Sequence, residues 1–225
     1  MRLLLQVLHR VDRLTVDPDL EVEANLNSEV SLRWSESRTR GYVTFFNNDF
    51  DNYIYLANTG ETDGDLPIFE HRQADAYLRG VETNVEIALA EWLKTSLGFD
   101  YLATGNKSTN RRLPLTPPAR VMWVGQLEDK PRGNFSESYA EIRLSWCDDG
   151  HISGPGEPFP FNTNSYLVST LSGGTTFTVS EDVNIALDLL IHNLFNTRYR
   201  DFLYTYKGVA DMPGRDVRLI VRLRF

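Results

Sequence analysis

The stretch DVRLIVRLRF, residues 216–225, decides how the rest of the chain is interpreted. Its residues alternate between an apolar set (Val217, Leu219, Val221, Leu223, Phe225) and a second set that carries three arginines (Arg218, Arg222, Arg224) and is interrupted by Ile220. Alternation with a period of two is typical of a β-strand that has one apolar and one wet face. Because three arginines share a face, we expect that face to meet water or a polar lumen.

The segments before this strand carry a recognisable order of motifs. VNIALDLLIH (183–192) alternates in the same way, NLFNTRYRD (193–201) follows it, and MPGR (212–215) precedes the last strand. This order resembles the C-terminal signature of TonB-dependent outer-membrane receptors. That signature has an Asn-Leu-Phe-Asn-x-x-Tyr-x-Asp segment, a Pro-Gly-Arg before the last strand, and a terminal Phe. The resemblance covers roughly residues 17–225 and is strongest from residue 183.

The spacing of strands and loops predicts a barrel wall. Short turns alternate with long loops, which we expect at about Asn58–Asp75, Gly105–Pro118 and Asp148–Asn164. Short turns on one side and long loops on the other are typical of transmembrane barrels, and runs of about 9–13 residues suit tilted spanning strands. We therefore predict an all-β, antiparallel up-and-down meander of about nine strands that forms part of a transmembrane β-barrel. Within the strand over Tyr166–Phe177, we expect a bulge or bend at Gly173-Gly174.

The resemblance also implies a domain organisation. Residues 1–24 are expected to be irregular, and residues 25–225 to be receptor-like β-barrel, the C-terminal part without the plug domain. The start, Met1 to Arg10, resembles a signal peptide, but its apolar part is short and lacks a small-residue cleavage site. We expect the chain to be a C-terminal piece of a receptor or a truncated gene product.

Composition excludes several classes of protein. The formal net charge of −8 argues against nucleic-acid binding, which depends on basic patches. There is no apolar run of roughly 18 residues, so no transmembrane helix is expected. Cys147 is the only cysteine, which excludes an intramolecular disulfide and a cysteine metal cluster. Ser172-Gly173-Gly174 lacks a Gly-x-Ser-x-Gly nucleophile elbow. We therefore predict no catalytic residues, no enzyme activity and no cofactor.

Histidines and arginines supply the candidate binding residues. His71 and His151 stand beside acidic residues in expected extracellular loops, where they could bind zinc or another divalent metal ion. The alternative is that these loop histidines are only solvated, which is more common. His192 is expected to line the lumen or to contact a plug. The arginines Arg198, Arg200, Arg218, Arg222 and Arg224 could attract an anionic ferric chelate. We favour the alternative that they pair with carboxylates such as Asp188, Glu82 and Glu86, or with the plug.

Two hypotheses of function remain. The resemblance implies an outer-membrane receptor of a Gram-negative bacterium that takes up a ferric siderophore, metal or cobalamin. Its partners would be membrane lipid, a plug domain, a TonB-type energising protein and the outer-membrane assembly machinery, which would recognise Phe225. The alternative is a soluble all-β binding module whose long loops bind a carbohydrate or protein. The module predicts apolar faces packed between two sheets, whereas the receptor predicts them on the outside of one.

Overall fold

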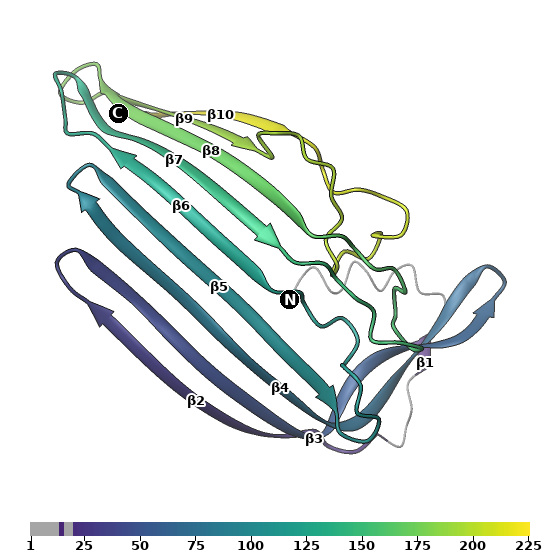
Figure 1. The fold of residues 1–225 in the computed structure, drawn as a ribbon. Coiled ribbons are helices and arrows are strands. Elements are labelled where there is room, and N and C mark those ends of the chain that lie inside the picture. Colours follow the sequence, from purple (N-terminus) through teal and green to yellow (C-terminus); the bar gives the residue numbers. More distant parts are fainter. Residues whose placement is uncertain (1–13, 16–19) are drawn as a thin grey trace.

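The chain folds as one curved sheet (Figure 1). The computed structural model describes residues 14–15 and 20–225. Nine antiparallel strands, β2 to β10, follow one another in sequence order across the sheet, which confirms the expected all-β meander. The strands are β1 (Leu14–Thr15), β2 (Ala24–Ser35), β3 (Thr39–Asp63), β4 (Leu66–Ala90), β5 (Leu93–Asn106), β6 (Arg120–Glu128), β7 (Phe135–Cys147), β8 (Tyr166–Thr178), β9 (Asn184–His192) and β10 (Asp216–Arg224). Among the described residues, no helix is long and apolar enough to cross a bilayer.

The outer face of the sheet carries a continuous apolar belt. Cross-strand pairing sets one row of this belt across seven neighbouring strands, apolar in all of them except β4, where Thr83 stands: Leu32, Val43, Thr83, Phe99, Val121, Trp146 and Leu167. Its members are not packed against another layer, since Leu32 is 66% exposed and Leu219 on β10 is 68% exposed. In the described part of the chain, the apolar faces are therefore outside a single sheet and not between two stacked sheets.

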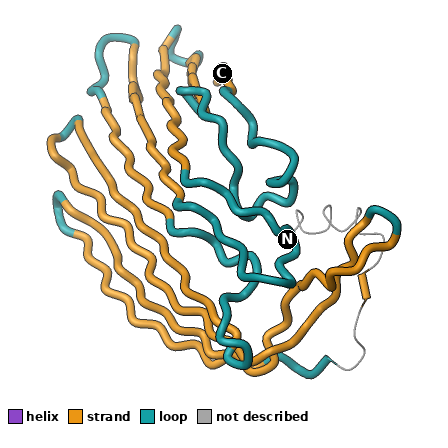
Figure 2. The backbone as a smooth tube through the Cα atoms, turned by 45° about the vertical axis from the view of Figure 1, so that its right-hand side comes forward, coloured by secondary structure: helices purple, strands orange, loops and turns teal. Residues whose placement is uncertain are grey.

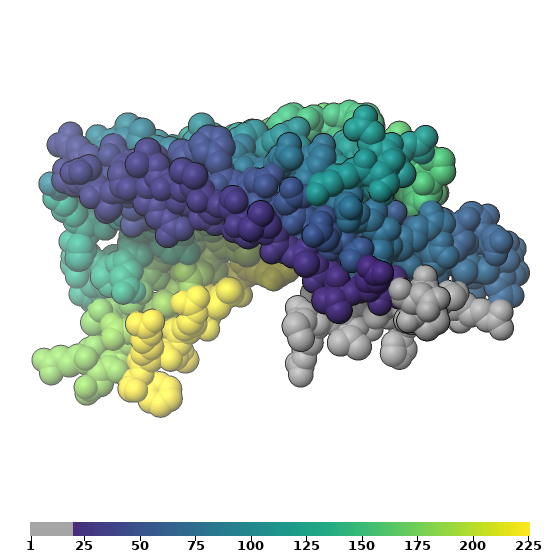
Figure 3. All heavy atoms as spheres, turned by 90° about the horizontal axis from the view of Figure 1, so that it is seen from below, coloured from purple at the N-terminus to yellow at the C-terminus, as the bar shows by residue number. Residues whose placement is uncertain are grey.

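The opposite face of the sheet is polar and concave. The neighbouring row there runs through Ser31, Thr44, Glu82, Asp100, Arg120, Cys147 and Tyr166. The space-filling view shows the sheet curving around a hollow between its first strands and the last one (Figure 3). The alternation seen in the sequence thus becomes a wall with an apolar outside and a polar inside.

Connections of different length gather at opposite ends of the wall. The short turns, residues 36–38, 91–92, 129–134 and 179–183, lie at one end, and the long loops, residues 107–119, 148–165 and 193–215, at the other (Figure 1). The expected rhythm of short and long connections is confirmed at these seven positions. The eighth connection, between β3 and β4, differs from the expectation.

The expectation of a long loop at Asn58–Asp75 is wrong, because β3 and β4 continue through this segment as a hairpin. The pairing runs from Tyr53 opposite Ala74 to Asp63 opposite Leu66, and Gly64 turns the chain with a φ of +64°. Register shifts interrupt the hairpin twice. A strand that is not half buried has no need for period-two alternation, so composition alone resembles a loop here. The tip of the hairpin bends away from the wall (Figure 2).

Two further expectations concern local structure. The bulge expected at Gly173-Gly174 is wrong, since both glycines pair in regular register and the shift between β7 and β8 lies between Ser136 and Tyr139. The irregular segment expected over residues 1–24 lies mostly outside the described residues. Within it, Leu14–Thr15 pairs in parallel with Phe69 and Glu70 of β4.

Buried side chains concentrate where the long loops meet. Of the largest fully buried side chains, Phe202, Lys207, Glu157, Asn193 and Pro158 belong to loops, and only Ser169 belongs to a strand. We call the assembly of the hairpin tip (residues 53–75) and the three long loops the loop cap. The packed interior of the described chain is therefore the loop cap, and the wall itself is one layer thick.

Candidate functional site

The loop cap is held together by bonds between segments far apart in sequence. Asn58 N donates to Gly156 O at 2.9 Å, which joins the hairpin to loop 148–165, and Lys107 N donates to Asp75 O at 2.8 Å. The rings of Phe69 and Phe159 lie 5.9 Å apart and add an apolar contact. In Figure 2 the loops lie between the end of the wall and the hairpin.

Glu157 joins two of the loops from inside. Its side chain is buried, and the residue is 1% exposed. One carboxylate oxygen accepts from Leu115 N at 3.0 Å, and the other accepts from Ser153 N and Ser153 Oγ at 3.1 and 2.9 Å. A buried carboxylate is stable only when its oxygens are bonded in this way, so Glu157 fixes loop 107–119 against loop 148–165.

The third long loop carries a buried cation. Lys207 is 1% exposed and its Nζ lies 3.5 Å from the centre of the Phe202 ring. Burial lowers the pKa of the Lys207 ammonium, against the attraction of Glu157 and Asp201. Phe202 occupies the space beside Gly150, where a Cβ would meet the ring at 2.4 Å. Loop 193–215 is thereby seated against loop 148–165.

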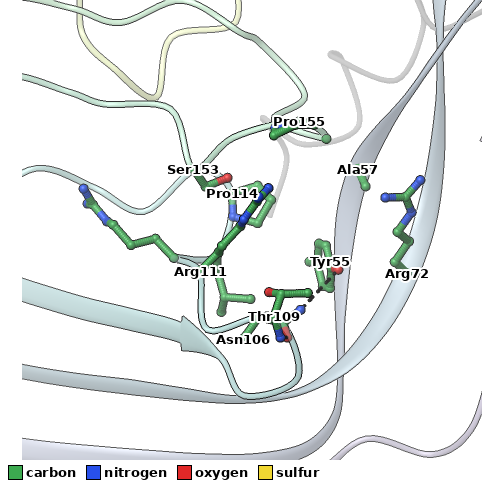
Figure 4. A pocket seen from close by; sticks show the side chains of 12 residues that line it. Tyr55, Ala57, Arg72, Asn106, Thr109, Arg111, Pro114, Ser153 and Pro155 are labelled. Atoms are coloured by element: carbon green, nitrogen blue, oxygen red, sulfur yellow. Dashed lines mark hydrogen bonds between the residues drawn. The ribbon is translucent and has the colours of Figure 1, made fainter.

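A cavity of about 110 Å³ opens between the hairpin and two of the loops (Figure 4). Tyr55 and Arg72 line it from the hairpin, Arg111 and Arg112 from loop 107–119, and Ser153 with its neighbours from loop 148–165. We call it the arginine pocket, because three arginines and no carboxylate line it. In Figure 4, Arg72 and Arg111 stand on opposite sides of the space. Its geometry suits recognition of an anion.

A wider hollow of about 510 Å³ lies on the polar face just below the loop cap. It brings together two residues expected in the lumen, His192 and Arg218, with Arg143 of the wall and Asp201 of loop 193–215. Thr170 Oγ1 and His192 Nδ1 are 3.1 Å apart, within hydrogen-bond distance. This hollow presents both charge signs, in contrast to the arginine pocket.

Four of the five candidate arginines near the end of the chain, Arg198, Arg200, Arg218 and Arg222, pair with carboxylates. Arg222 pairs with Asp188 at 3.0 Å on the polar face, as expected, and Arg218 pairs with its neighbour Asp216. Arg198 and Arg200 both pair with Asp211 and not with Glu82 or Glu86. Glu86 instead pairs with Arg40 at 2.8 Å. Arg224 ends β10 opposite Asn184, and Phe225 beyond it is 99% exposed.

The two candidate histidines lie in different segments of the loop cap. His71 lies in the hairpin opposite Leu56, and His151 in loop 148–165 contacts Asp149. Hydrogen bonding to the Asp148 side chain, together with the attraction of His151, lowers the pKa of Asp149. Among the described residues, no group of three or more His, Cys, Asp or Glu side chains is arranged to hold a metal ion. Neither histidine lines the arginine pocket.

Sequence reasoning missed the arginine pocket. Arg111 and Arg112 are adjacent in the long loop expected at Gly105–Pro118, and Arg72 falls within the long loop expected at Asn58–Asp75. The doublet Arg111-Arg112 was a usable signal. The sequence gives no signal that this doublet lies near Arg72, because that contact depends on the β3–β4 hairpin, where a loop was expected.

Comparisons with known proteins place the chain. The family model described as "TonB dependent receptor-like, beta-barrel" matches residues 11–196. Among solved structures, the copper transporter OprC aligns with a TM-score of 0.75 at 16% identity, covering 92% of this chain and 32% of that one. The siderophore receptor PirA from Acinetobacter baumannii aligns with a TM-score of 0.63 at 16% identity, covering 94% of this chain and 33% of that one. The FrpB iron transporter from Neisseria meningitidis aligns with a TM-score of 0.66 at 15% identity, covering 94% of this chain and 32% of that one. The chain thus spans about a third of the length of these structures. A search among curated proteins found no match.

Proposed function

Because the chain belongs to the family of TonB-dependent receptor β-barrels, we propose that it forms part of the wall and ligand-binding mouth of a receptor for a scarce nutrient. Members of this family are outer-membrane proteins of Gram-negative bacteria. The proposed location of this chain is that membrane, with the apolar belt in lipid and the loop cap outside the cell. The nutrient would be a ferric siderophore, a metal or cobalamin.

One observation supports this proposal most strongly: a single curved sheet leaves its entire apolar face uncovered in the described residues. Leu97 on β5 is 52% exposed and Leu219 on β10 is 68% exposed, at opposite parts of the same belt. Soluble monomers rarely expose contiguous apolar patches of more than a few hundred Å², whereas lipid-facing barrel walls require them.

The open edges of the sheet also support the proposed barrel wall. β2 and β10 end the sheet, and no described strand pairs with their outer sides. In hydrocarbon each unpaired backbone group costs several kcal/mol. We therefore expect further strands to pair with these edges and close a barrel, which in transporters of this kind has about 22 strands.

The proposed work is binding and gated release without covalent chemistry. A nutrient would bind at the loop cap and pass along the polar face when a TonB-type protein acts on a plug domain. The structural relatives are named for copper, siderophore and iron, and these are the first nutrients to test. Phe225 would be recognised by the outer-membrane assembly machinery.

The test is growth under limitation of one nutrient at a time. We expect deletion of the gene that encodes this chain to impair growth when one of iron chelate, copper or cobalamin is scarce. A plasmid copy should restore growth only in cells that have the TonB-type protein. Growth that is unaffected for every nutrient, or restored equally without that protein, would contradict the proposed uptake.

Cell fractionation tests the location and separates the receptor from a soluble binding module. We expect the protein in the outer-membrane fraction, extracted only by detergent. A monodisperse monomer in the soluble fraction without detergent would instead favour the module, since a lipid-facing belt would aggregate in water.

A further inference from the structure

The arginine pocket is electrostatically unlike the rest of the chain. The whole chain has a formal net charge of −8, yet three arginines and no carboxylate line this one cavity. Arg72 has an acidic partner, since its Nε lies 2.5 Å from Glu70 Oε1. Within residues 14–15 and 20–225, Arg111 and Arg112 have no carboxylate partner. The pocket therefore holds two guanidinium groups, those of Arg111 and Arg112, that no carboxylate of the described residues pairs with.

Two glycines lie beside the guanidinium groups in one turn of loop 148–165. A Cβ on Gly154 would lie 3.3 Å from Arg111 Nη1, and a Cβ on Gly156 would lie 3.7 Å from Arg72 Nη1. Both glycines have left-handed φ angles, +128° and +99°, which favour glycine. The two guanidinium groups thus flank the same three-residue turn, and Ser153 beside it lines the cavity.

Charge and donor chemistry identify the class of ligand. Guanidinium groups donate in a planar fork that matches the two oxygens of a carboxylate or phosphate. Like charges around a cavity repel one another, and an anion between them removes that repulsion. Tyr55 and Thr109 add hydroxyl groups to the lining. No acidic side chain is present to coordinate a bare metal cation.

Size limits what can enter. A cavity of about 110 Å³ has room for a few water molecules, hence for one oxyanion group and not for a chelate with several rings. We propose that the arginine pocket is a subsite for a single oxyanion group, a carboxylate or phosphate of a soluble molecule. That the molecule is the nutrient or its chelator rests on the proposed function; binding of the anion does not.

The direct test is titration of the full chain in detergent with citrate and with inorganic phosphate, at low ionic strength and with chloride as the reference anion. We expect saturable binding of at least one of the two oxyanions. Arg72→Gln and Arg111→Gln should each weaken it about tenfold or more, because a charge-assisted hydrogen bond is lost. Arg132→Gln is the matched control, since Arg132 lies in the short turn at the far end of the wall, and it should leave the affinity unchanged.

Two results would overturn the proposal. One is the absence of saturable binding, or an equal loss of binding in Arg132→Gln. The other is saturation only by phosphatidylglycerol in mixed micelles, which would assign the charge to lipid headgroups. If oxyanions bind but no nutrient depends on the gene, the proposed function fails and the subsite stands. If a nutrient depends on the gene but no oxyanion binds, the subsite fails and the proposed function stands.

A second measurement needs no variant and so does not depend on variants folding. Phenylglyoxal modifies accessible arginines, and mass spectrometry reports each site. We expect citrate or phosphate to slow modification of Arg111 severalfold relative to chloride and to leave Arg132 unaffected. Equal rates at Arg111 with and without the oxyanions would contradict the proposal.

Discussion

Gly174 occupies a point on the polar face of the wall where three neighbours leave no room for a side chain. A Cβ there would lie 2.5 Å from Asp188 Oδ1, 2.8 Å from Leu187 O and 2.9 Å from Tyr139 Cε1. Tyr139 donates to Asp188 Oδ1 at 3.0 Å, and Asp188 pairs with Arg222. One glycine thus allows a polar connection across β7, β8, β9 and β10.

We predict that Gly174→Ala destabilises the folded chain by about 1–3 kcal/mol, the usual cost of overpacking. The clash includes a backbone oxygen, which a side-chain rotation does not relieve. Gly98→Ala on the same face of β5 is the control, because its Cβ would meet nothing closer than 3.3 Å. The measurement is urea unfolding of the detergent-folded chain. Equal midpoints for the two variants would contradict the role of Gly174.

Single residues also mark where the sequence was informative and where it was not. The pairing of Arg222 with Asp188 was expected from alternation, because both residues fall on the polar parity of neighbouring strands. The role of Gly174 could not be expected from the sequence. A glycine pair in a strand predicts a bulge as readily as it predicts an aromatic ring packed over it. Only the register of β7 against β8 distinguishes the two.

At the scale of elements, the Asn-Leu-Phe-Asn segment has a physical explanation. Asn193 and Asn196 have positive φ angles of 51° and 54°. Asn193 bonds through its side chain to Thr197 N and Thr197 O, and Asn196 Oδ1 accepts from Arg215 N at 2.9 Å. A Cβ on Gly214 would lie 2.7 Å from that same oxygen. The two motifs that carried the resemblance therefore form one device that turns β9 into its loop and returns it to β10.

The middle of this loop depends on one carboxylate, which makes its stability pH-dependent. Hydrogen bonds from Arg200 and then Arg198 hold the pKa of Asp211 below its usual value. A lowered folded pKa stabilises the native state above the unfolded pKa, near 3.9, and that contribution is lost as the pH falls through the folded pKa. We predict that Asp211→Asn unfolds earlier than the native chain at pH 7 and that the gap narrows below about pH 4.

Thermal unfolding at pH 7 and at pH 3 measures this gap. Asp182→Asn is the control, because Asp182 is exposed in the short turn between β8 and β9, and it should unfold close to the native chain at pH 7. A gap between Asp211→Asn and the native chain that stays constant across this range would contradict the role given to Arg200 and Arg198.

The β3–β4 hairpin shows the limit of prediction at this scale. Strands in the wall were recognisable because one face is apolar and the other polar. The hairpin tip lies beyond the wall, where this division is not required, and glycines and aspartates there have the composition of a loop. The arginine pocket is lined in part by this hairpin, so the sequence could not predict the pocket either.

At the scale of the whole molecule, the wall was predictable and the loop cap was not. Alternation is local, and it determines which side of every strand faces outward. The cap depends on contacts such as Asn58 with Gly156 and Leu115 with Glu157, which join residues 98 and 42 positions apart. No local pattern encodes those meetings, so the sequence indicated where binding residues would gather but not which of them would meet.

The sidedness of the wall gives a prediction about the molecule as a whole. Leu97 lies in the apolar belt opposite Val85 and Trp123, whereas its neighbour Ser96 lies on the polar face between Glu86 and Val124. If the belt is in lipid, Leu97→Arg should destabilise the chain in phospholipid vesicles by about 2–4 kcal/mol, the cost of an arginine at the bilayer midplane. Ser96→Arg is the matched control, one position away, and should cost much less because its guanidinium reaches water and Glu86. Reversible urea unfolding in vesicles compares the two. Equal costs, or a greater cost for Ser96→Arg, would mean that the exposed apolar face does not contact lipid.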